Sequence, residues 1–131
     1  FVSQLRVLVE ECDGYFYPDV VVVCGEPQLT DSRPPSLLNP IVIIEVLSES
    51  TEQRDRGEKF ACYRTLPSLQ EYLIVSSSAY SVEHYVRVTP DKWMLTIYQG
   101  SDAVLELPSI RCSVPLREVY ARTDFVSPTH L

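Results

Sequence analysis

The stretch "NPIVIIEVLSES" (residues 39–50) decides how the rest of the chain is interpreted. Its aliphatic residues occupy consecutive positions rather than alternate ones, which is typical of a strand that is buried on both faces. Glu45 lies inside this aliphatic run. An ionised carboxylate in such a strand costs on the order of several kcal/mol unless a partner compensates its charge. The pattern therefore raises the question of what compensates Glu45.

A helix and a second buried strand follow the Glu45 strand. Ser50 and Gln53 fit a capping box, which predicts a helix over about residues 51–66. Residues 71–76, "EYLIVS", then read as a further buried strand. Because a helix that joins two buried strands is a crossover connection, we expect the sheet to be at least partly parallel.

Alternating and aliphatic segments predict the remaining elements. We expect strands at residues 1–10, 20–23, 81–88, 93–100 and 103–110, with 81–100 forming a hairpin, and a short final helix at 115–122. The fold class is therefore α/β, and the length of 131 residues is that of a single domain. One long helix covers only one face of the sheet, so the predicted elements leave the other face without a cover.

Composition and charge exclude several classes of protein. The chain has 11 basic and 18 acidic residues, a net charge of −7, which disfavours broad electrostatic binding to a nucleic acid backbone. It contains no apolar run of about 18 residues that could span a membrane, and its first residues do not resemble a signal peptide.

The four cysteines are widely spaced and form no CxxC pair; they are Cys12, Cys24, Cys62 and Cys112. We expect them to be free thiols, which agrees with a cytoplasmic location. Since the chain has only two histidines and no paired cysteines, a zinc site of the usual ligand types is not expected.

Asp19 and Glu45 share one arrangement, because each is an acid at the edge or inside of a strongly aliphatic strand. One interpretation is that Asp19 caps its strand and Glu45 pairs with an arginine. The other is that both hold a cation such as Mg²⁺, which prefers carboxylate and carbonyl oxygens. Lys59 also has two interpretations: it forms an exposed pair with Asp55 four residues earlier, or it reaches the carboxylates from the edge of the buried side of the helix.

Four segments together resemble a known family. They are "YPDVVVV" (17–23), "IVIIEVLSES" (41–50), "DRGEKFACYR" (55–64) and "LPSLQEYLIV" (66–75). This series is similar to the PD-(D/E)XK nuclease superfamily, and more closely to its bacterial Uma-type restriction-endonuclease-like family. The resemblance covers nearly the whole chain and implies a restriction-endonuclease-like mixed β-sheet flanked by helices. The family normally begins with a helical segment that this chain lacks, so we expect residues 1–131 to be one N-terminally truncated domain.

The resemblance also implies the site. Asp19 matches the acid of the PD motif and Glu45 the acid of the ExK motif, while Leu47 stands where the wider superfamily has a lysine. Lys59 matches the lysine that one branch of the family carries on the following helix. By the same analogy Asp19, Glu45 and the Val46 carbonyl would hold Mg²⁺ or Mn²⁺, and DNA would be the substrate of a metal-dependent endonuclease. Lys59 would stabilise the charge that develops on the phosphate.

Other interpretations remain open. Tyr63 and Ser48 are candidates for supporting contacts, although both residue types at these positions are more often structural. The domain could instead be an inactive nuclease relative that acts in binding or assembly, which the net charge of −7 favours. A glycoside hydrolase that uses Asp19 and Glu45 is a third alternative, but the chain has only one tryptophan for sugar subsites. A sheet with one uncovered apolar face also leads us to expect a homodimer.

Overall fold

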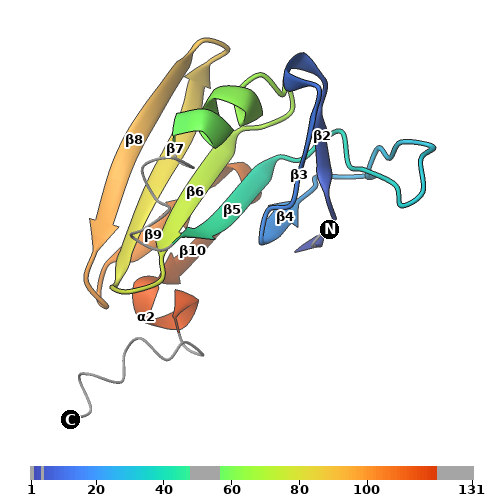
Figure 1. The fold of residues 1–131 in the computed structure, drawn as a ribbon. Coiled ribbons are helices and arrows are strands. Elements are labelled where there is room, and N and C mark those ends of the chain that lie inside the picture. The colour runs from blue at the N-terminus through green and yellow to red at the C-terminus, as the bar shows by residue number, and fades with distance from the viewer. Residues whose placement is uncertain (1, 4, 48–56, 121–131) are drawn as a thin grey trace.

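The computed structural model of the chain describes residues 2–3, 5–47 and 57–120. Six strands form its main sheet in the order β1–β4–β5–β6–β7–β8 (Figure 1). Their bounds are β1 Val2–Ser3, β4 Val20–Val22, β5 Val42–Leu47, β6 Glu71–Ser76, β7 Ser81–Thr89 and β8 Lys92–Gln99. Strands β5 and β6 run parallel, and the other neighbouring pairs run antiparallel. The predicted mixed sheet and α/β fold class are therefore confirmed.

Two small hairpins flank the main sheet. Their strands are β2 Val7–Val9 with β3 Gly14–Phe16, and β9 Val104–Leu107 with β10 Cys112–Pro115. A 3-10 turn lies between the strands of each hairpin, at Glu10–Cys12 and at Pro108–Ile110, and helix α2 follows at Leu116–Val119. The single strand predicted over residues 1–10 is therefore wrong in its extent, and β3 and β10 are strands that the sequence pattern did not indicate. These strands are only two to four residues long, so they hold too few residues for a period of two to be recognised.

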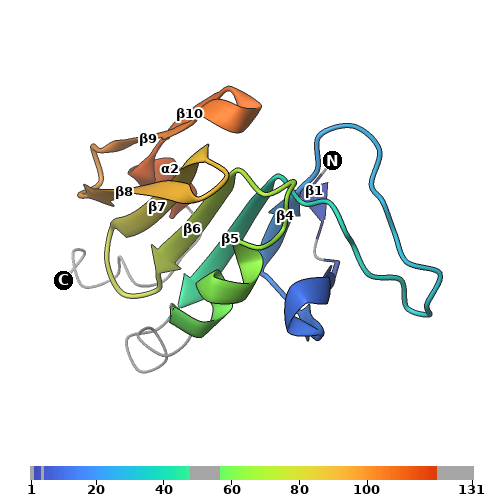
Figure 2. The ribbon, with the colours of Figure 1, turned by 90° about the horizontal axis from the view of Figure 1, so that it is seen from above.

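A helix lies against one face of the main sheet, and its described part spans residues 57–63 (Figure 2). The predicted helix extended to residue 66, but the backbone N–H groups of Thr65 and Leu66 bond to carbonyls three residues earlier instead of four. The last turn is thus tightened, as is common at helix ends. The guanidinium of Arg87 in β7 then donates hydrogen bonds to the Arg64, Leu66 and Leu69 carbonyls, which fixes this end of the helix to the sheet.

The opposite face of the sheet is covered by the β9–β10 hairpin and helix α2 (Figure 2). The buried side chains of this second core are Val42, Leu73, Val75, Val82, Leu105, Leu107, Leu116 and Tyr120. The expectation that this face lacks a cover is therefore wrong for the described residues. Elements at β9 and α2 were predicted from the sequence, but their place over the sheet was not, because periodicity carries no information on packing partners.

A disulfide joins Cys12 and Cys62, with their Cα atoms 5.9 Å apart. The expectation of four free thiols is thus wrong, since only Cys24 and Cys112 are free. The two bonded residues are separated by 50 positions and come together because the β2–β3 hairpin packs beside the helix. The cytoplasmic location loses the support that it drew from free thiols. No helix in the described ranges is long and apolar enough to cross a lipid bilayer.

Candidate active site

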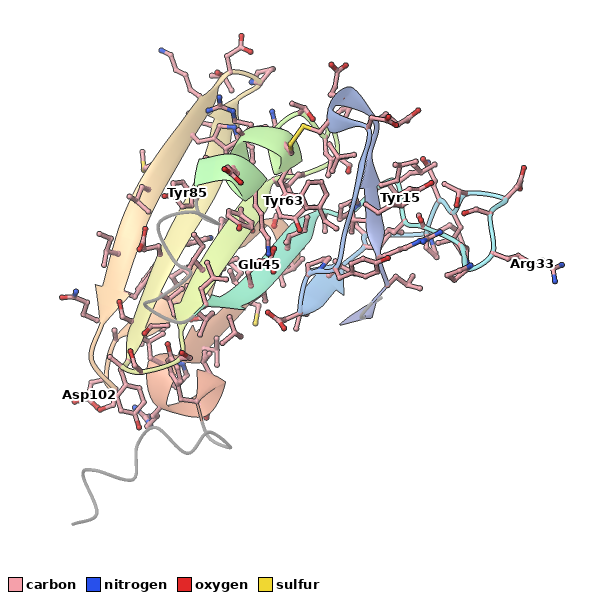
Figure 3. The ribbon with its side chains drawn as sticks, viewed as in Figure 1. Tyr15, Arg33, Glu45, Tyr63, Tyr85 and Asp102 are labelled. Atoms are coloured by element: carbon pink, nitrogen blue, oxygen red, sulfur yellow. A yellow bond between two sulfur atoms is a disulfide. The ribbon has the colours of Figure 1, made fainter. Side chains whose placement is uncertain are left out.

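Glu45 lies on the face of β5 that the helix covers. Side chains alternate along a strand, and its neighbours Ile43 and Leu47 belong to the core beneath the helix, whereas Val42 packs in the second core on the opposite face. Glu45 is only 2% exposed. The structure thus confirms that a carboxylate is buried inside the aliphatic strand, and it shows from which side partners can reach it (Figure 3).

Two side chains of the helix contact one oxygen of Glu45. The Tyr63 hydroxyl donates a hydrogen bond to Glu45 Oε2 at 3.0 Å, and Lys59 Nζ lies 3.5 Å from the same oxygen. Positions four apart on a helix lie on the same side, which brings both side chains over β5. Of the two interpretations of Lys59, the structure therefore favours contact with the carboxylate. Asp55, the alternative partner, lies outside the described residues.

Asp19 reaches the same region from the adjacent strand. Val20 of β4 pairs with Ile44 of β5, so Asp19, one residue before β4, stands beside Glu45. Its Oδ2 accepts a hydrogen bond from the Val46 backbone N–H at 2.7 Å. Since the N–H and C=O of one strand residue point toward the same neighbouring strand, the Val46 carbonyl is also directed to the Asp19 side of β5. Asp19 itself is exposed, so the group opens to solvent here.

The electrostatics of Glu45 show incomplete compensation. Burial is the largest influence and raises the pKa of Glu45 above its ordinary value, while Lys59 and the Tyr63 hydrogen bond act in the opposite direction. Asp19 raises it further, because two carboxylates repel each other when both are ionised. Burial and the Glu45 carboxylate in turn raise the pKa of Tyr63 well above its ordinary value. The phenol therefore stays protonated and remains a donor.

These groups fit a hard divalent cation. Asp19 and Glu45 offer carboxylate oxygens, the Val46 carbonyl lies at the same edge, and Mg²⁺ completes its coordination with water or substrate oxygens. Within the described ranges no three His, Cys, Asp or Glu side chains form a group that could hold a metal. The described residues therefore contain no metal site whose ligands are all side chains. Mg²⁺ does not need one, because one or two carboxylates together with water suffice to bind it. Ser48, a predicted supporting residue, lies outside the described residues.

Packing around Tyr63 adds a residue that the sequence analysis did not single out. The Phe16 ring lies with its centroid 5.0 Å from that of Tyr63, and Tyr72 contacts the Tyr63 ring at 5.4 Å. Phe16 belongs to the unpredicted strand β3, so its place beside the site had no signal in the sequence. Tyr63 had one, since it lies four residues after Lys59 and shares its side of the helix.

A cleft of about 600 Å³ lies away from this group. It is lined by residues after the helix and in the β7–β8 turn, among them Arg64, Arg87 and Trp93. The Arg87 guanidinium is occupied by backbone carbonyls and by the Trp93 ring, 4.5 Å away. Because the Arg87 guanidinium serves the packing of the fold, this cleft offers less chemistry than the group formed by Asp19, Glu45 and Lys59.

The mixed sheet, with an acid-bearing strand pair under a helix, is a nuclease-like fold. It resembles the crystal structure of "a putative nuclease belonging to DUF820" from Anabaena variabilis, with a TM-score of 0.69 and 16% identity, over 92% of this chain and 67% of that one. The family described as "Uma2: Putative restriction endonuclease" matches residues 1–116. The chain belongs to this family, as the segments around Asp19, Glu45 and Lys59 indicated.

Two uncharacterized proteins of Synechocystis sp. (strain PCC 6803) are similar in sequence. The protein sll1609 is 45% identical over 106 residues, which are 81% of this chain and 60% of that protein. The protein slr1290 is 38% identical over 123 residues, which are 94% of this chain and 63% of that protein. The chain thus spans about three fifths of the length of these relatives.

Proposed function

We propose that this protein is a Mg²⁺-dependent endonuclease that hydrolyses phosphodiester bonds of DNA, with Mn²⁺ as an alternative metal. The observation that carries the proposal is the convergence of three groups: Asp19 and Glu45 on adjacent strands, and Lys59 directed at Glu45 from the helix. The family and the fold support a nuclease in general terms. The metal and the substrate are the parts that we add.

Each residue has a role in this proposal. Asp19, Glu45 and the Val46 carbonyl hold the metal, which when bound supplies an acidified water and polarises a phosphate oxygen. Lys59 lies at the boundary between the buried carboxylate and solvent, its side chain 29% exposed. From there its ammonium group can face a substrate phosphate and stabilise the negative charge that develops on it. Asp19, which is exposed, lies where a phosphate would approach.

The partners follow from the charge and the surface. With a net charge of −7 we expect DNA to be contacted locally, near Lys59, rather than over a broad basic face. We include a homodimer in the proposal because edge strand β8 exposes large apolar side chains, Met94 at 59% and Ile97 at 55%. The cytoplasm, where DNA is accessible, is the location that we propose.

A second candidate function is a nuclease fold without catalysis, acting in binding or assembly. Its supporting observation is that Tyr63 and Lys59 already contact Glu45 Oε2, so the protein compensates part of this charge itself. This candidate predicts a folded protein that binds neither Mg²⁺ nor Mn²⁺.

The test combines calorimetry with cleavage of supercoiled plasmid DNA in Mg²⁺ and in EDTA. We expect Glu45→Gln to remove both metal binding and cleavage. Lys59→Gln should keep metal binding but lower the cleavage rate by about 10² to 10³-fold, because it removes only charge stabilisation. Glu118→Gln, on the exposed surface of α2, is the matched control and should leave both unchanged. Cleavage that persists in a pure Glu45→Gln preparation would contradict the proposal, and absence of metal binding by the wild type would favour the second candidate.

A further inference from the structure

Tyr63 makes a directed polar contact from inside the core. Its side chain is fully buried, yet its hydroxyl donates to Glu45 Oε2 at 3.0 Å, and Glu45 is itself 2% exposed. A buried hydroxyl without a hydrogen-bond partner is costly. The Tyr63 hydroxyl meets this requirement by bonding to the Glu45 carboxylate. The bond joins the helix to the middle of β5, between residues 18 positions apart.

The Tyr63 ring is held in place by its neighbours. Phe16 of β3 packs at a tilt of 56° on one side, and Tyr72 of β6 contacts it at a tilt of 51°. The disulfide at the adjacent Cys62 ties the same turn of the helix to Cys12. The hydroxyl is thus presented by a ring with little freedom to move, which is what fixing the position of another side chain requires.

Among the described residues, both contacts of the Glu45 carboxylate fall on Oε2. Tyr63 and Lys59 approach this oxygen from the helix, whereas Asp19 lies beside Glu45 on the segment that leads into β4. The other oxygen, Oε1, is the one that a cation at the Asp19 edge can use. A carboxylate whose rotamer is fixed in this way binds a metal without first having to be ordered.

We propose that Tyr63 is a positioning residue: its hydroxyl holds Glu45 Oε2 so that Oε1 is presented to a divalent cation shared with Asp19. This inference rests on the proposed function, because it assigns Tyr63 a role in metal binding at that site. It goes beyond it in naming a residue that touches neither metal nor substrate but sets the affinity of the site. The Tyr63 hydroxyl would keep Glu45 in place while Lys59, which contacts the same oxygen, turns toward a phosphate.

Tyr63→Phe separates this role from that of a core ring, because it removes the hydroxyl and keeps the packing against Phe16 and Tyr72. We expect the Mg²⁺ dissociation constant, measured by calorimetry, to rise about 10 to 100-fold, as is usual when a group that supports a metal ligand is removed. The pH below which Mg²⁺ binding is lost should also move upward, since a hydrogen bond to the ionised carboxylate favours that form. Tyr72→Phe, which removes a hydroxyl from the adjoining ring, is the control and should leave both values unchanged.

A second measurement needs no variant. In wild-type protein with ¹³C-labelled tyrosine, Mg²⁺ should shift the Tyr63 ring resonances and leave those of Tyr120, on the opposite face, in place. The inference would be overturned if Tyr63→Phe binds Mg²⁺ with wild-type affinity and pH dependence, or if Mg²⁺ leaves the Tyr63 resonances unshifted. If Glu45→Gln still abolishes Mg²⁺ binding, these results would leave the proposed function standing. A wild type that binds no Mg²⁺ would overturn the proposed function and this inference together.

Discussion

Two buried glutamates on neighbouring strands show how one fold treats the same charge in two ways. Glu45 in β5 and Glu71 in β6 are 2% and 0% exposed. They point to opposite faces of the sheet, because Tyr72 and Ile74 of β6 pack beneath the helix, whereas Leu73 and Val75 belong to the second core. Because both side chains are almost completely buried, the difference between them comes mainly from their partners.

Glu71 has donors on both oxygens. His84 Nε2 lies 2.5 Å from Oε1, and both the backbone N–H and the hydroxyl of Ser109 donate to Oε2, the former at 2.7 Å. Burial is the largest single influence and raises the pKa of Glu71, but the hydrogen bonds from His84 and Ser109 together hold it below its ordinary value. The ionised carboxylate is therefore the stable form, and its bonds join β6, β7 and the turn after β9.

Glu45 has donors on one oxygen and a second acid, Asp19, beside it, and its pKa is raised. The comparison teaches that burial alone does not identify a functional carboxylate in this protein. Among the described residues, what distinguishes Glu45 is that donors reach only one of its two oxygens. The hydrogen bonds of Glu71 stabilise the fold, whereas the partly compensated charge of Glu45 beside a second acid is the physical basis for the cation that we propose there.

The largest expected effect is the loss of stability in Glu71→Ala. The substitution leaves the buried His84 and the Ser109 N–H without their shared acceptor, and breaking a buried pair of this kind costs about 3 to 5 kcal/mol. The change is measured as the free energy of unfolding in urea titrations. Glu106→Ala, at an exposed position of β9, is the control.

The pH dependence of Glu71→Ala supplies an independent check. Because the pKa of Glu71 is lowered in the fold, its contribution is complete above the ordinary value of 4.5 and is lost as the pH falls from there through the folded-state pKa. The difference between wild type and variant should narrow over that range. If Glu71→Ala unfolds at the same urea concentration as wild type, hydrogen bonds are not what separates the two glutamates.

The sequence distinguished the two glutamates only in part. Glu45 stands between aliphatic residues on both sides, so its burial could be predicted from its position. Glu71 is the first residue of the buried strand predicted at 71–76, but a charged residue at this position normally marks the boundary of a loop, so the burial of its own side chain was not indicated. Its partner His84 lies 13 residues away on the next strand, a contact that only the pairing of β6 with β7 creates. The sequence pattern of a segment predicts whether the segment is buried, but not which side chains from other segments contact it.

The same limit applies to the rest of the fold. The strands around Glu45, β6 and the β7–β8 hairpin were predicted because their periodicity is local. The Cys12–Cys62 bond and the cover of the second face were not, because each depends on segments that are distant in the sequence. For the site, the positions of Asp19 and Lys59 in the pattern made them candidates, the resemblance to the family selected between the interpretations, and their roles stay a proposal.

The Cys12–Cys62 disulfide sharpens the comparison, because the partners of Glu45 come from a helix that it tethers, whereas the donors to Glu71 come from β7 and the turn after β9. We expect Cys12→Ser to lower the free energy of unfolding by about 2 to 4 kcal/mol, the usual contribution of a disulfide. The Cys12→Ser substitution should also weaken Mg²⁺ binding near Glu45, while the NMR resonances of His84 should stay close to their wild-type positions. Cys24→Ser, at an exposed free cysteine, is the control for both readouts. Equal disturbance of the two sites would show that the tether supports the whole fold rather than the helix.

The smallest expected effect has the opposite sign. In metal-free buffer, Glu45→Gln should increase the free energy of unfolding at neutral pH by about 0.5 to 2 kcal/mol, the range of substitutions that relieve a functional cost. The pKa of Glu45 is raised in the fold, so its ionised form is less stable there than in the unfolded chain. As the pH falls below the folded-state pKa, Glu45 becomes protonated in the fold, and the advantage of glutamine should shrink until it is gone at the ordinary value of 4.5.

Urea titrations across this pH range, with Glu106→Gln for comparison, measure the size and the direction of the change. A Glu45→Gln variant that is less stable than wild type at neutral pH would show that Lys59 and Tyr63 already compensate the carboxylate in full. Glu45 would then belong with Glu71 as a structural carboxylate, and the physical reason to expect a cation beside Asp19 would be removed. A more stable variant that no longer binds Mg²⁺ would show that the fold keeps an unfavourable charge at this position for the sake of the metal.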